Sequence, residues 1–502
     1  GSVIMLKYFS YGDEIVLFWD KTVKFASLYE IFLNGEKIGE TAKTFFRIKD
    51  LEPETEYGVS VGVRGRGEKT DIVSETKCRT AKVKKDIVVT DFPYRAVGDG
   101  NTLNTVAIQR AIDDCGFGYR VVIPKGVFKT GALRLSDDTE LYVEKGGILQ
   151  GSEKKEDYLP KIPSRFEGKE TLCYSSLINV GHLDRSGKTS VKNVIIRGKG
   201  EIIGGGEELL FDTIGIAGGN LREKRRKLKA YQDDLFSDKE EKFRSRGRLI
   251  NISNAKRVII DGLELGNAPS WNIHMIYSEN VITCGCKIFS KGIWNGDGWD
   301  PDSSKDCTLF DCEFDTGDDC VAIKSGKNPE GNVIGIPTEN VDIFACNVKK
   351  GRSHGVAIGS EVSGGINGVK IWDCDFSYSF FGVHIKTTRK RGGYVKDVEV
   401  RDSKISRVFV RQVDYNDDGA AAKELTEISD ITFDNVDIEY NSGDPNFGLE
   451  ADTYIYVKGF KDATDKIRDI TLKNIRINNK AKLREYDVED CENVMYNGKR
   501  IK

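Results

Sequence analysis

The segment NVDIFACNV (Asn340–Val348) is followed one repeat later by GVKIWDCDF (Gly368–Phe376), and both carry the same spacing of apolar residues. Two apolar residues stand two apart, and three positions further on a second such pair begins. Runs with this spacing start at Val258, Val281, Cys307, Val341, Val369, Val398, Ile431 and Ile470. Of the 32 positions in the pattern, four in each of eight runs, only Thr283 and Ser403 are not apolar. Such regularity is a property of the fold and not of chance.

Apolar residues two apart indicate a short strand with one buried face, because successive side chains of a strand point to opposite sides. Two such strands joined by a bend recur every 23 to 39 residues, with the extra residues outside the pattern. This arrangement predicts an all-β protein built as a right-handed parallel β-helix, and an amphipathic helix at about residues 104–115 is expected to close its first end. Four cysteines share one phase and are expected to pack as an inward ladder rather than bind metal: Cys286, Cys312, Cys346 and Cys374.

Residues 1–82 show a different pattern. Short alternating runs bounded by turn residues predict a small β-sandwich there. Within it, LEPETEY (Leu51–Tyr57) resembles the tyrosine-corner signature of fibronectin type III domains, with Trp19 as the expected core aromatic. A basic stretch at residues 82–85 is expected to be the linker, so that the β-helix domain covers residues 83–502.

The composition fits a globular protein with a large core, since 39% of the 502 residues are hydrophobic and 31% are charged. A formal net charge of −3 argues against nucleic acid as a partner. The sequence has no apolar run of about 18 residues and no signal-peptide pattern, so neither a membrane span nor secretion is expected and a cytoplasmic location is favoured. Secretion after removal of an upstream signal is the alternative. The eleven cysteines form no CxxC pairs with downstream partners, which argues against zinc.

Acidic residues are crowded in residues 294–326. They are Asp297, Asp300, Asp315, Asp318 and Asp319. Like charges repel, and crowding raises at least one carboxyl pKa. Crowded carboxyl groups are typical of two kinds of site, a cation site and a general acid paired with a general base.

The repeat alignment places part of this acidic region on one face of the β-helix. Asp297, Asp318, His354 and Lys386 follow the anchors of four consecutive coils by 16, 11, 13 and 17 residues. Residues at a similar phase of stacked coils lie side by side. The four ionisable side chains are therefore predicted to meet.

Four segments occur in this region: NGDGWDPDSS (Asn295–Ser304), GDDCVAIKSG (Gly317–Gly326), GRSHGVAIGSE (Gly351–Glu361) and GVHIKTT (Gly382–Thr388). In content and order they resemble the signature segments of glycoside hydrolase family 28, the polygalacturonases, and the resemblance extends over about residues 86–502. It implies inverting hydrolysis of α-1,4-galacturonosyl linkages, with polygalacturonate or an oligogalacturonide as the substrate and with no cofactor and no metal.

The resemblance also implies roles. Asp318 resembles the general acid, and Asp297 and Asp319 resemble the pair that positions and deprotonates water. His354 is expected to support the protonation and geometry of the acid. Independently of the family, inversion needs one protonated carboxyl and one carboxylate, and mutual repulsion within an aspartate cluster can divide those states.

Residues expected to bind substrate are Asn295, Lys324, His384, Lys386, Arg389 and Arg391. The sequence departs from the family pattern at Gly296, where threonine is usual, and at His384-Ile385-Lys386, where Arg-Ile-Lys is usual. We expect Arg389 or Arg391 to supply the planar group that His384 cannot. The alternative is that both are solvated loop cations.

Other functions are weighed against this one. A calcium site, which a polyuronide lyase on the same fold would need, is disfavoured by the cations His354, Lys386, Arg389 and Arg391. A non-catalytic carbohydrate-binding β-helix would have no need for Asp318 beside Asp319. Rhamnogalacturonan or xylogalacturonan hydrolysis stays open, because fold does not fix substrate.

A charged insertion lies between Gly206 and Arg246 and lacks the coil pattern. We predict that it folds over the catalytic face and closes one end, leaving room for a terminal sugar whose carboxylate meets basic residues of the insertion. These are Arg222, Lys224, Arg225 and Arg226. The prediction is exo cleavage from the non-reducing end. If the insertion packs on the first domain or lies in solvent, endo cleavage is expected instead.

Overall fold

The computed structural model describes residues 4–22, 28–64, 69–233, 240–349, 354–441 and 452–502. They form two compact units, Gly1–Asp86 with Phe117–Arg120, and Ile87–Gly116 with Val121–Lys502. The first long segment thus ends at Asp86, whereas the sequence placed the boundary at residue 82. Among the described helices, none has both the length and the apolar character needed to cross a membrane.

The first unit packs two antiparallel sheets around one core. One sheet contains β1 (Leu6–Ser10), β2 (Ile15–Trp19) and β5 (Phe45–Ile48), and the other contains β3 (Tyr29–Leu33), β4 (Glu36–Thr41), β6 (Glu56–Arg64) and β7 (Thr70–Arg79). Trp19 and Tyr29 meet edge to face at 5.3 Å in the core. The backbone N–H of Glu52 donates to Tyr57 Oη at 3.0 Å, the contact expected of the corner. The unit is the small β-sandwich that the sequence predicted.

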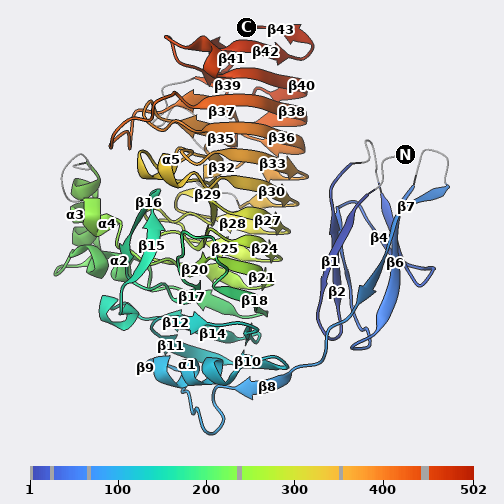
Figure 1. The fold of residues 1–502 in the computed structure, drawn as a ribbon, viewed down its shortest axis with the longest axis vertical. Helices are drawn as coiled ribbons and strands as arrows, with labels where there is room; N and C mark the ends of the chain where they lie inside the picture. The colour runs from blue at the N-terminus through green and yellow to red at the C-terminus, as the bar shows by residue number, and fades with distance from the viewer. Residues whose placement is uncertain (1–3, 23–27, 65–68, 234–239, 350–353, 442–451) are drawn as a thin grey trace. The chain divides into compact units, whose positions relative to one another are not determined.

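The second unit is the predicted right-handed parallel β-helix (Figure 1). Its strands stack in register, so that Cys307 pairs with Val341, and Val341 with Val369. These are the positions that the repeat alignment equated. Their side chains lie in one buried core that continues from coil to coil.

The coils of this unit are built from three rows of strands. The first row contains β10 (Tyr119–Ile123), β13 (Glu140–Val143), β18 (Val191–Gly198), β21 (Ala255–Asp261), β24 (Glu279–Cys284), β27 (Lys305–Phe310), β30 (Thr338–Phe344), β33 (Ile366–Trp372), β36 (Tyr394–Ile405), β38 (Glu427–Glu439), β40 (Arg468–Asn478) and β42 (Glu492–Tyr496). The second row contains β11 (Gly126–Thr130), β14 (Gly147–Gly151), β19 (Glu201–Ile203), β22 (Glu264–Gly266), β25 (Lys287–Phe289), β28 (Glu313–Asp315), β31 (Asn347–Val348) and β34 (Asp375–Phe376). The third row forms a separate sheet and contains β12 (Leu133–Leu135), β17 (Ile178–Gly181), β20 (Ile250–Ser253), β23 (Ile273–Ile276), β26 (Trp299–Asp302), β29 (Asp319–Ile323), β32 (His354–Ile358), β35 (Val383–Thr387), β37 (Val408–Gln412), β39 (Thr453–Lys458) and β41 (Arg484–Glu489).

The predicted end helix is α1 (Thr105–Asp114), which buries Ile108, Ala111 and Ile112 against the first coil. The amphipathic pattern therefore predicted both the presence and the place of helix α1.

The short elements outside the three rows and the insertions are β8 (Lys85–Val88), β9 (Asp99–Leu103), β43 (Lys499–Arg500), η1 (Lys155–Tyr158), η2 (Thr464–Lys466) and α5 (Glu330–Ile334).

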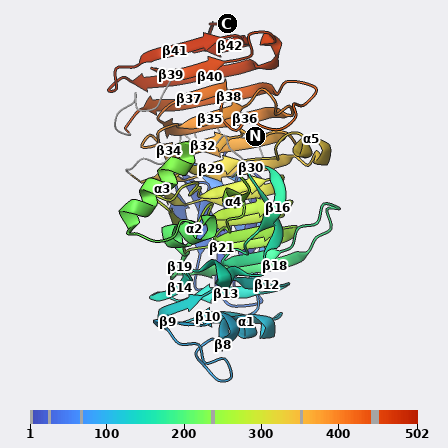
Figure 2. The ribbon, with the colours of Figure 1, turned by 90° about the vertical axis from the view of Figure 1, so that its left-hand side faces the viewer.

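Two insertions lie on the side of the third row of strands (Figures 1 and 2). One is the hairpin of β15 (Ile162–Phe166) and β16 (Lys169–Cys173). The other contains α2 (Gly206–Ile214), α3 (Leu221–Asp233) and α4 (Glu240–Phe243), and its residues 234–239 lie outside the described residues. The third row is the sheet that carries the predicted catalytic residues.

The four cysteines of the predicted ladder are buried in the core. Each thiol donates to the carbonyl two residues earlier, at 3.2 Å for Cys286 and 3.3 Å for Cys312, with the same contact made by Cys346 and Cys374. Burial is the main cause that raises the pKa of Cys312 and Cys346 well above the usual thiol value. These enclosed thiols fill space in the core, as predicted.

Candidate active site

The order of strands in the third row brings the predicted catalytic residues together. Asp297 lies just before β26, Asp319 begins β29, His354 begins β32 and Lys386 lies in β35, and these are four consecutive strands. Asp319 and His354 are register partners. The shared phase read from the sequence is therefore a shared face in the structure. The first residues of the third motif, 351–353, lie outside the described residues.

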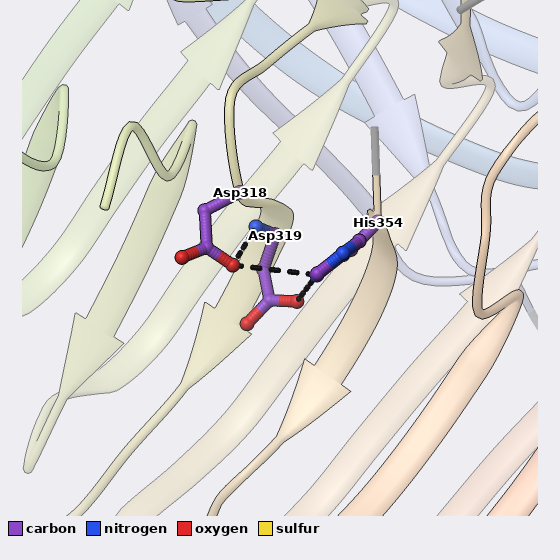
Figure 3. Close-up of side chains that lie close together, drawn as sticks. All are labelled: Asp318, Asp319 and His354. Carbon is purple, nitrogen blue, oxygen red and sulfur yellow. Dashed lines mark hydrogen bonds and ion pairs between the residues drawn. The ribbon is translucent and has the colours of Figure 1, made fainter. Parts of the chain in front are cut away.

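Asp318, Asp319 and His354 form a hydrogen-bonded cluster (Figure 3). His354 Nδ1 lies 3.3 Å from Asp318 Oδ1 and 3.3 Å from Asp319 Oδ1, and the Asp319 N–H donates to Asp318 Oδ1 at 2.9 Å. Burial disfavours the imidazolium, but the hydrogen bonds to both carboxylates outweigh it and raise the pKa of His354 to about 10. Burial likewise opposes charge on Asp318, yet His354 and nearby lysines lower its pKa to about 2. The proton of this cluster therefore resides on His354.

The pKa of Asp297 is shifted in the opposite direction to that of Asp318. Its side chain is buried, and burial first, then the charges of Asp300 and Asp318, raise its pKa well above the usual value. Burial also raises the pKa of Asp300 to about 7. One part of the site thus favours a protonated carboxyl and the other an ionised one, which is the division of states that acid-base hydrolysis of a glycoside requires.

Lys324 lies within the protein beneath these carboxylates. Its side chain is 6% exposed, and Nζ lies 3.7 Å from Asp297 Oδ2, 3.5 Å from Asp300 Oδ2 and 3.7 Å from Glu361 Oε1. Nζ also lies 3.6 Å from the centre of the Trp271 ring. The expectation that Lys324 contacts substrate is corrected by this burial. Lys324 instead balances the charge of three carboxyl groups and holds them in place.

Lys386 presents a cation beside the acidic cluster. Nζ lies 3.8 Å from Asp319 Oδ2 and donates to Tyr415 Oη at 3.2 Å. Burial would lower the pKa of Lys386, but Tyr415, Asp319 and Asp318 outweigh it and raise that pKa above its usual value. Lys386 is therefore a fixed positive charge on the catalytic face, where the family motif expects a carboxylate-binding lysine.

A guanidinium lies next to His384, where the family motif usually has its own arginine. His384 is buried, and burial followed by the charges of Lys386 and Arg411 lowers its pKa well below the usual value. The neutral ring accepts a hydrogen bond at Nε2 from Arg411 Nε at 3.2 Å. Arg411 is also the register partner of Lys386. His384 thus orients Arg411 instead of presenting itself to a ligand.

The sequence analysis did not identify Arg411 or Tyr415. A signal for Arg411 existed, because the coil alignment places it at the phase of Lys386 one coil later. Tyr415 lies beyond the end of β37, outside the repeat, so no periodic pattern marks it.

Arg391 and Arg389 both form contacts within the protein that the sequence analysis did not predict. Arg391 is 1% exposed, and its guanidinium donates to Ser360 O at 3.1 Å, Asn328 Oδ1 at 2.8 Å and Asn416 O at 2.8 Å. The expectation that Arg391 binds substrate is wrong, because its donors are used to join loops of the protein. Arg389 is exposed and forms a two-point ion pair with Asp462, with one contact at 2.8 Å.

The turn before Asp297 is held by Arg246. The Arg246 guanidinium donates to Asn295 Oδ1 at 2.6 Å and lies 4.4 Å from the centre of the Trp294 ring. The departure from the family at Gly296 has a steric reason, since a Cβ there would lie 2.8 Å from Ser290 Oγ. Asn295 is half-buried and its side-chain oxygen is directed to Arg246, so it fixes the turn that carries Asp297.

The inserted helices pack against this same turn. A cluster of buried apolar side chains joins them to it: Leu210, Phe211, Ile214, Ile216, Leu228, Phe243 and Ile293. Phe243 and Trp294 meet edge to face at 5.1 Å. The insertion is therefore fixed beside the acidic residues.

The basic residues of the insertion only partly follow the expectation. Lys224 donates to Glu208 at 2.6 Å, and Arg225 pairs with Glu207 at 2.8 Å, so both bind α2. These ion pairs engage both side chains in the free protein, and the expectation that the two meet a sugar carboxylate stays a prediction. Arg222 and Arg226 are exposed on α3, and for them the expectation stays a prediction.

The cluster of Asp318, Asp319 and His354 also has the composition of a cation site, since one ligand atom from each lies within 4.8 Å of the others. Two features disfavour a metal here. The raised pKa of His354 means that a metal would have to displace the proton of its ring before binding there. The ammonium of Lys386 lies 3.8 Å from Asp319 and repels a cation.

Comparison with known proteins agrees with this geometry. The chain is 31% identical over 349 residues to a probable polygalacturonase of Vitis vinifera, covering 66% of this chain and 65% of that protein. It is 27% identical over 492 residues to the exo-poly-alpha-D-galacturonosidase of Dickeya chrysanthemi, covering 86% and 81%. The structure of a Yersinia enterocolitica family 28 exopolygalacturonase superposes with a TM-score of 0.82 at 22% identity, covering 99% of both chains, and so shares the fold. Residues 138–499 match the family described as Glycosyl hydrolases family 28. The chain belongs to this family of glycoside hydrolases.

Proposed function

We propose that the protein hydrolyses α-1,4-galacturonosyl linkages of polygalacturonate or oligogalacturonides with inversion of configuration. The observation that carries the proposal is the Asp318–Asp319–His354 cluster beside Asp297, whose pKa is raised. An inverting glycosidase needs one carboxyl group to protonate the leaving oxygen and another to activate water. The name of the Dickeya chrysanthemi relative supports galacturonate as the sugar.

The family motifs assign the acid to Asp318 and the activation of water to Asp297 and Asp319. In the free protein the proton distribution is reversed, because the pKa of Asp318 is lowered and that of Asp297 is raised. A galacturonate carboxylate beside Lys386 would cancel part of the positive field that keeps Asp318 ionised. His354, whose Nδ1 lies 3.3 Å from Asp318 Oδ1, is the group placed to deliver a proton to Asp318.

Protonation of Asp318 has a consequence for Asp297. The negative charge of Asp318 is one of the causes that raise the pKa of Asp297. Once Asp318 is neutral, that repulsion ends and the pKa of Asp297 falls. Substrate binding thus prepares both groups, an acid on the leaving oxygen and a base for the water, through coupled titration of neighbouring carboxyls.

We further propose exo cleavage from the non-reducing end. The support is the position of α2, α3 and α4, which are fixed by Phe243 and Ile293 to the turn that carries Asp297. An insertion anchored there limits how far a polymer extends past the cleavage site on that side.

The experiment is analysis of products early in a digestion of polygalacturonate. Monogalacturonate as the main early product, with a slow fall in viscosity, is expected. A ladder of mixed oligomers with rapid loss of viscosity would contradict exo cleavage but not hydrolysis. Deletion of residues 221–242 is expected to shift the products towards oligomers. A product that absorbs near 235 nm would instead identify a lyase, while rhamnogalacturonan and xylogalacturonan as substrates separate the related hydrolases.

A further inference from the structure

A column of cations continues the catalytic face beyond Lys386, towards the C-terminal coils. Register pairs Lys386 with Arg411 and Arg411 with Lys458 on the neighbouring strands β35, β37 and β39. Val410 and Val457, the residues before the last two, belong to the core, so strand alternation turns the cations outward. Neighbouring strands are roughly 4.8 Å apart, so one positive charge recurs at about that interval.

An aromatic column runs beside the cations. Register pairs His384 with Phe409 and Phe409 with Tyr456, and the last two rings meet at 5.6 Å. Phe381 meets Phe409 at 5.3 Å, and the Arg411 guanidinium lies 5.4 Å from the Phe409 ring centre and 5.9 Å from that of Phe381. Contact with aromatic faces holds the planar guanidinium. Phe381 and Tyr456, at the edges of this column, are half-buried.

The sign of charge reverses one coil later. On β41, Glu489 is the register partner of Lys458 and Asp487 that of Tyr456. Lys458 Nζ lies 4.0 Å from Glu489 Oε2. Carboxylates at the end of the column repel an anionic ligand, which sets its length at Lys386, Arg411 and Lys458.

We propose that the outward face of β35, β37 and β39 binds the leaving portion of an anionic oligosaccharide, with Lys386, Arg411 and Lys458 contacting carboxylates of successive sugars. The inference rests on the proposed function and extends it. The terminal sugar lies on the side of the inserted helices, and the polymer runs towards the C-terminal coils. The half-buried Phe381 and Tyr456 contact the apolar faces of the sugars.

The test is the dependence of KM on substrate length. We would measure kcat and KM for di-, tri- and tetragalacturonate with the wild type, Arg411→Ala, Arg411→Lys and Lys458→Ala. Lys473→Ala is the matched control, because Lys473 is 48% exposed, as Lys458 is 49% exposed, but lies on β40 in the first row. Each cation is expected to matter only for substrates long enough to reach it.

Loss of the charge-assisted contact in Arg411→Ala is expected to raise KM for the trimer and tetramer about tenfold more than KM for the dimer. Arg411→Lys, which keeps the charge without the planar group, should give a smaller rise. Lys458→Ala is expected to raise KM for the tetramer about threefold more than for the trimer. Lys473→Ala should match the wild type at every length.

Two results would overturn the inference. One is an equal rise in KM for all lengths in Arg411→Ala and Arg411→Lys, which indicates a structural role for Arg411. The other is a tetramer KM in Lys458→Ala equal to that of Lys473→Ala. Hydrolysis of tetragalacturonate by the wild type distinguishes failure of the proposed function from failure of the proposed binding surface. If the wild type releases no reducing sugar from any length, the proposed function fails; if it does and the length profile is the same in all variants, only the binding surface fails.

Discussion

The ammonium of Lys324 lies 3.6 Å from the centre of the Trp271 ring and 3.5 Å from Asp300 Oδ2. The Trp271 ring is in turn stacked on Phe166 at 4.6 Å with an interplanar angle of 9°. Phe166 ends strand β15, so the hairpin is connected through two aromatic rings to the cation that supports the catalytic carboxyls. Inside the protein, both the aromatic face and the carboxylates compensate for the lost hydration of the ammonium.

Replacing Lys324 with methionine is expected to destabilise the protein. The variant leaves the buried Asp297 and Asp300 and the half-buried Glu361 without their shared cation, and breaking a buried ion pair costs about 3–5 kcal/mol. Urea unfolding measures the change in free energy. Lys305→Met is the control, since Lys305 is 55% exposed and its pair with Glu279 contributes about 1 kcal/mol or less. Equal unfolding free energies for the two variants would contradict the role given to Lys324.

The pH dependence of stability tests the state of His354. Its folded pKa of about 10 exceeds the usual 6.5, so its bonds to Asp318 and Asp319 stabilise fully below about pH 6.5. That stabilisation is lost as pH rises through about 10. The Tm of the wild type should therefore fall more than that of His354→Gln between pH 6.5 and 10. The exposed His182 supplies the control, and His182→Gln should keep the slope of the wild type. Parallel curves for wild type and His354→Gln would argue against a protonated His354.

Sequence reasoning reached the fold because each coil repeats one apolar pattern, and stacking turns that repetition into register, as for Val341 and Val369. It also placed Asp318, Asp319 and His354 together, because residues at the same point of successive coils of a β-helix lie side by side. It failed for Lys324 and Arg391, because the sequence of a motif does not show whether a basic side chain in it is buried or exposed. Burial of Arg391 depends on Ser360 and on other distant acceptors that no local pattern marks.

The anchor of the insertion has its own test. Phe243→Ala removes the ring that packs on Trp294, and loss of a buried aromatic costs about 3–5 kcal/mol of local packing. Looser attachment of α2–α4 should increase the share of oligomers among early products of polygalacturonate. Phe92→Ala, at a side chain that is 79% exposed, should leave the product profile as it is. Identical product profiles for both variants would contradict a role of the insertion in exo cleavage.

Chelation tests the absence of a metal requirement. Because His354 is protonated and Lys386 lies beside Asp319, treatment with EDTA and dialysis is expected to leave kcat and KM unchanged. Added calcium should not raise the rate. Loss of activity on chelation, restored by one divalent ion, would assign the Asp318–Asp319–His354 cluster to metal binding instead.

The most direct measurement is release of reducing ends from polygalacturonate by the wild type and by Asp318→Asn, with absorbance near 235 nm recorded in parallel. The amide in this variant keeps the shape of the side chain but cannot protonate the leaving oxygen, and loss of a general acid reduces kcat by about 10²–10⁴-fold. The account predicts steady release by the wild type without absorbance at 235 nm, and loss of release in the variant on that scale. Equal rates for the two proteins, or an unsaturated product, would contradict it.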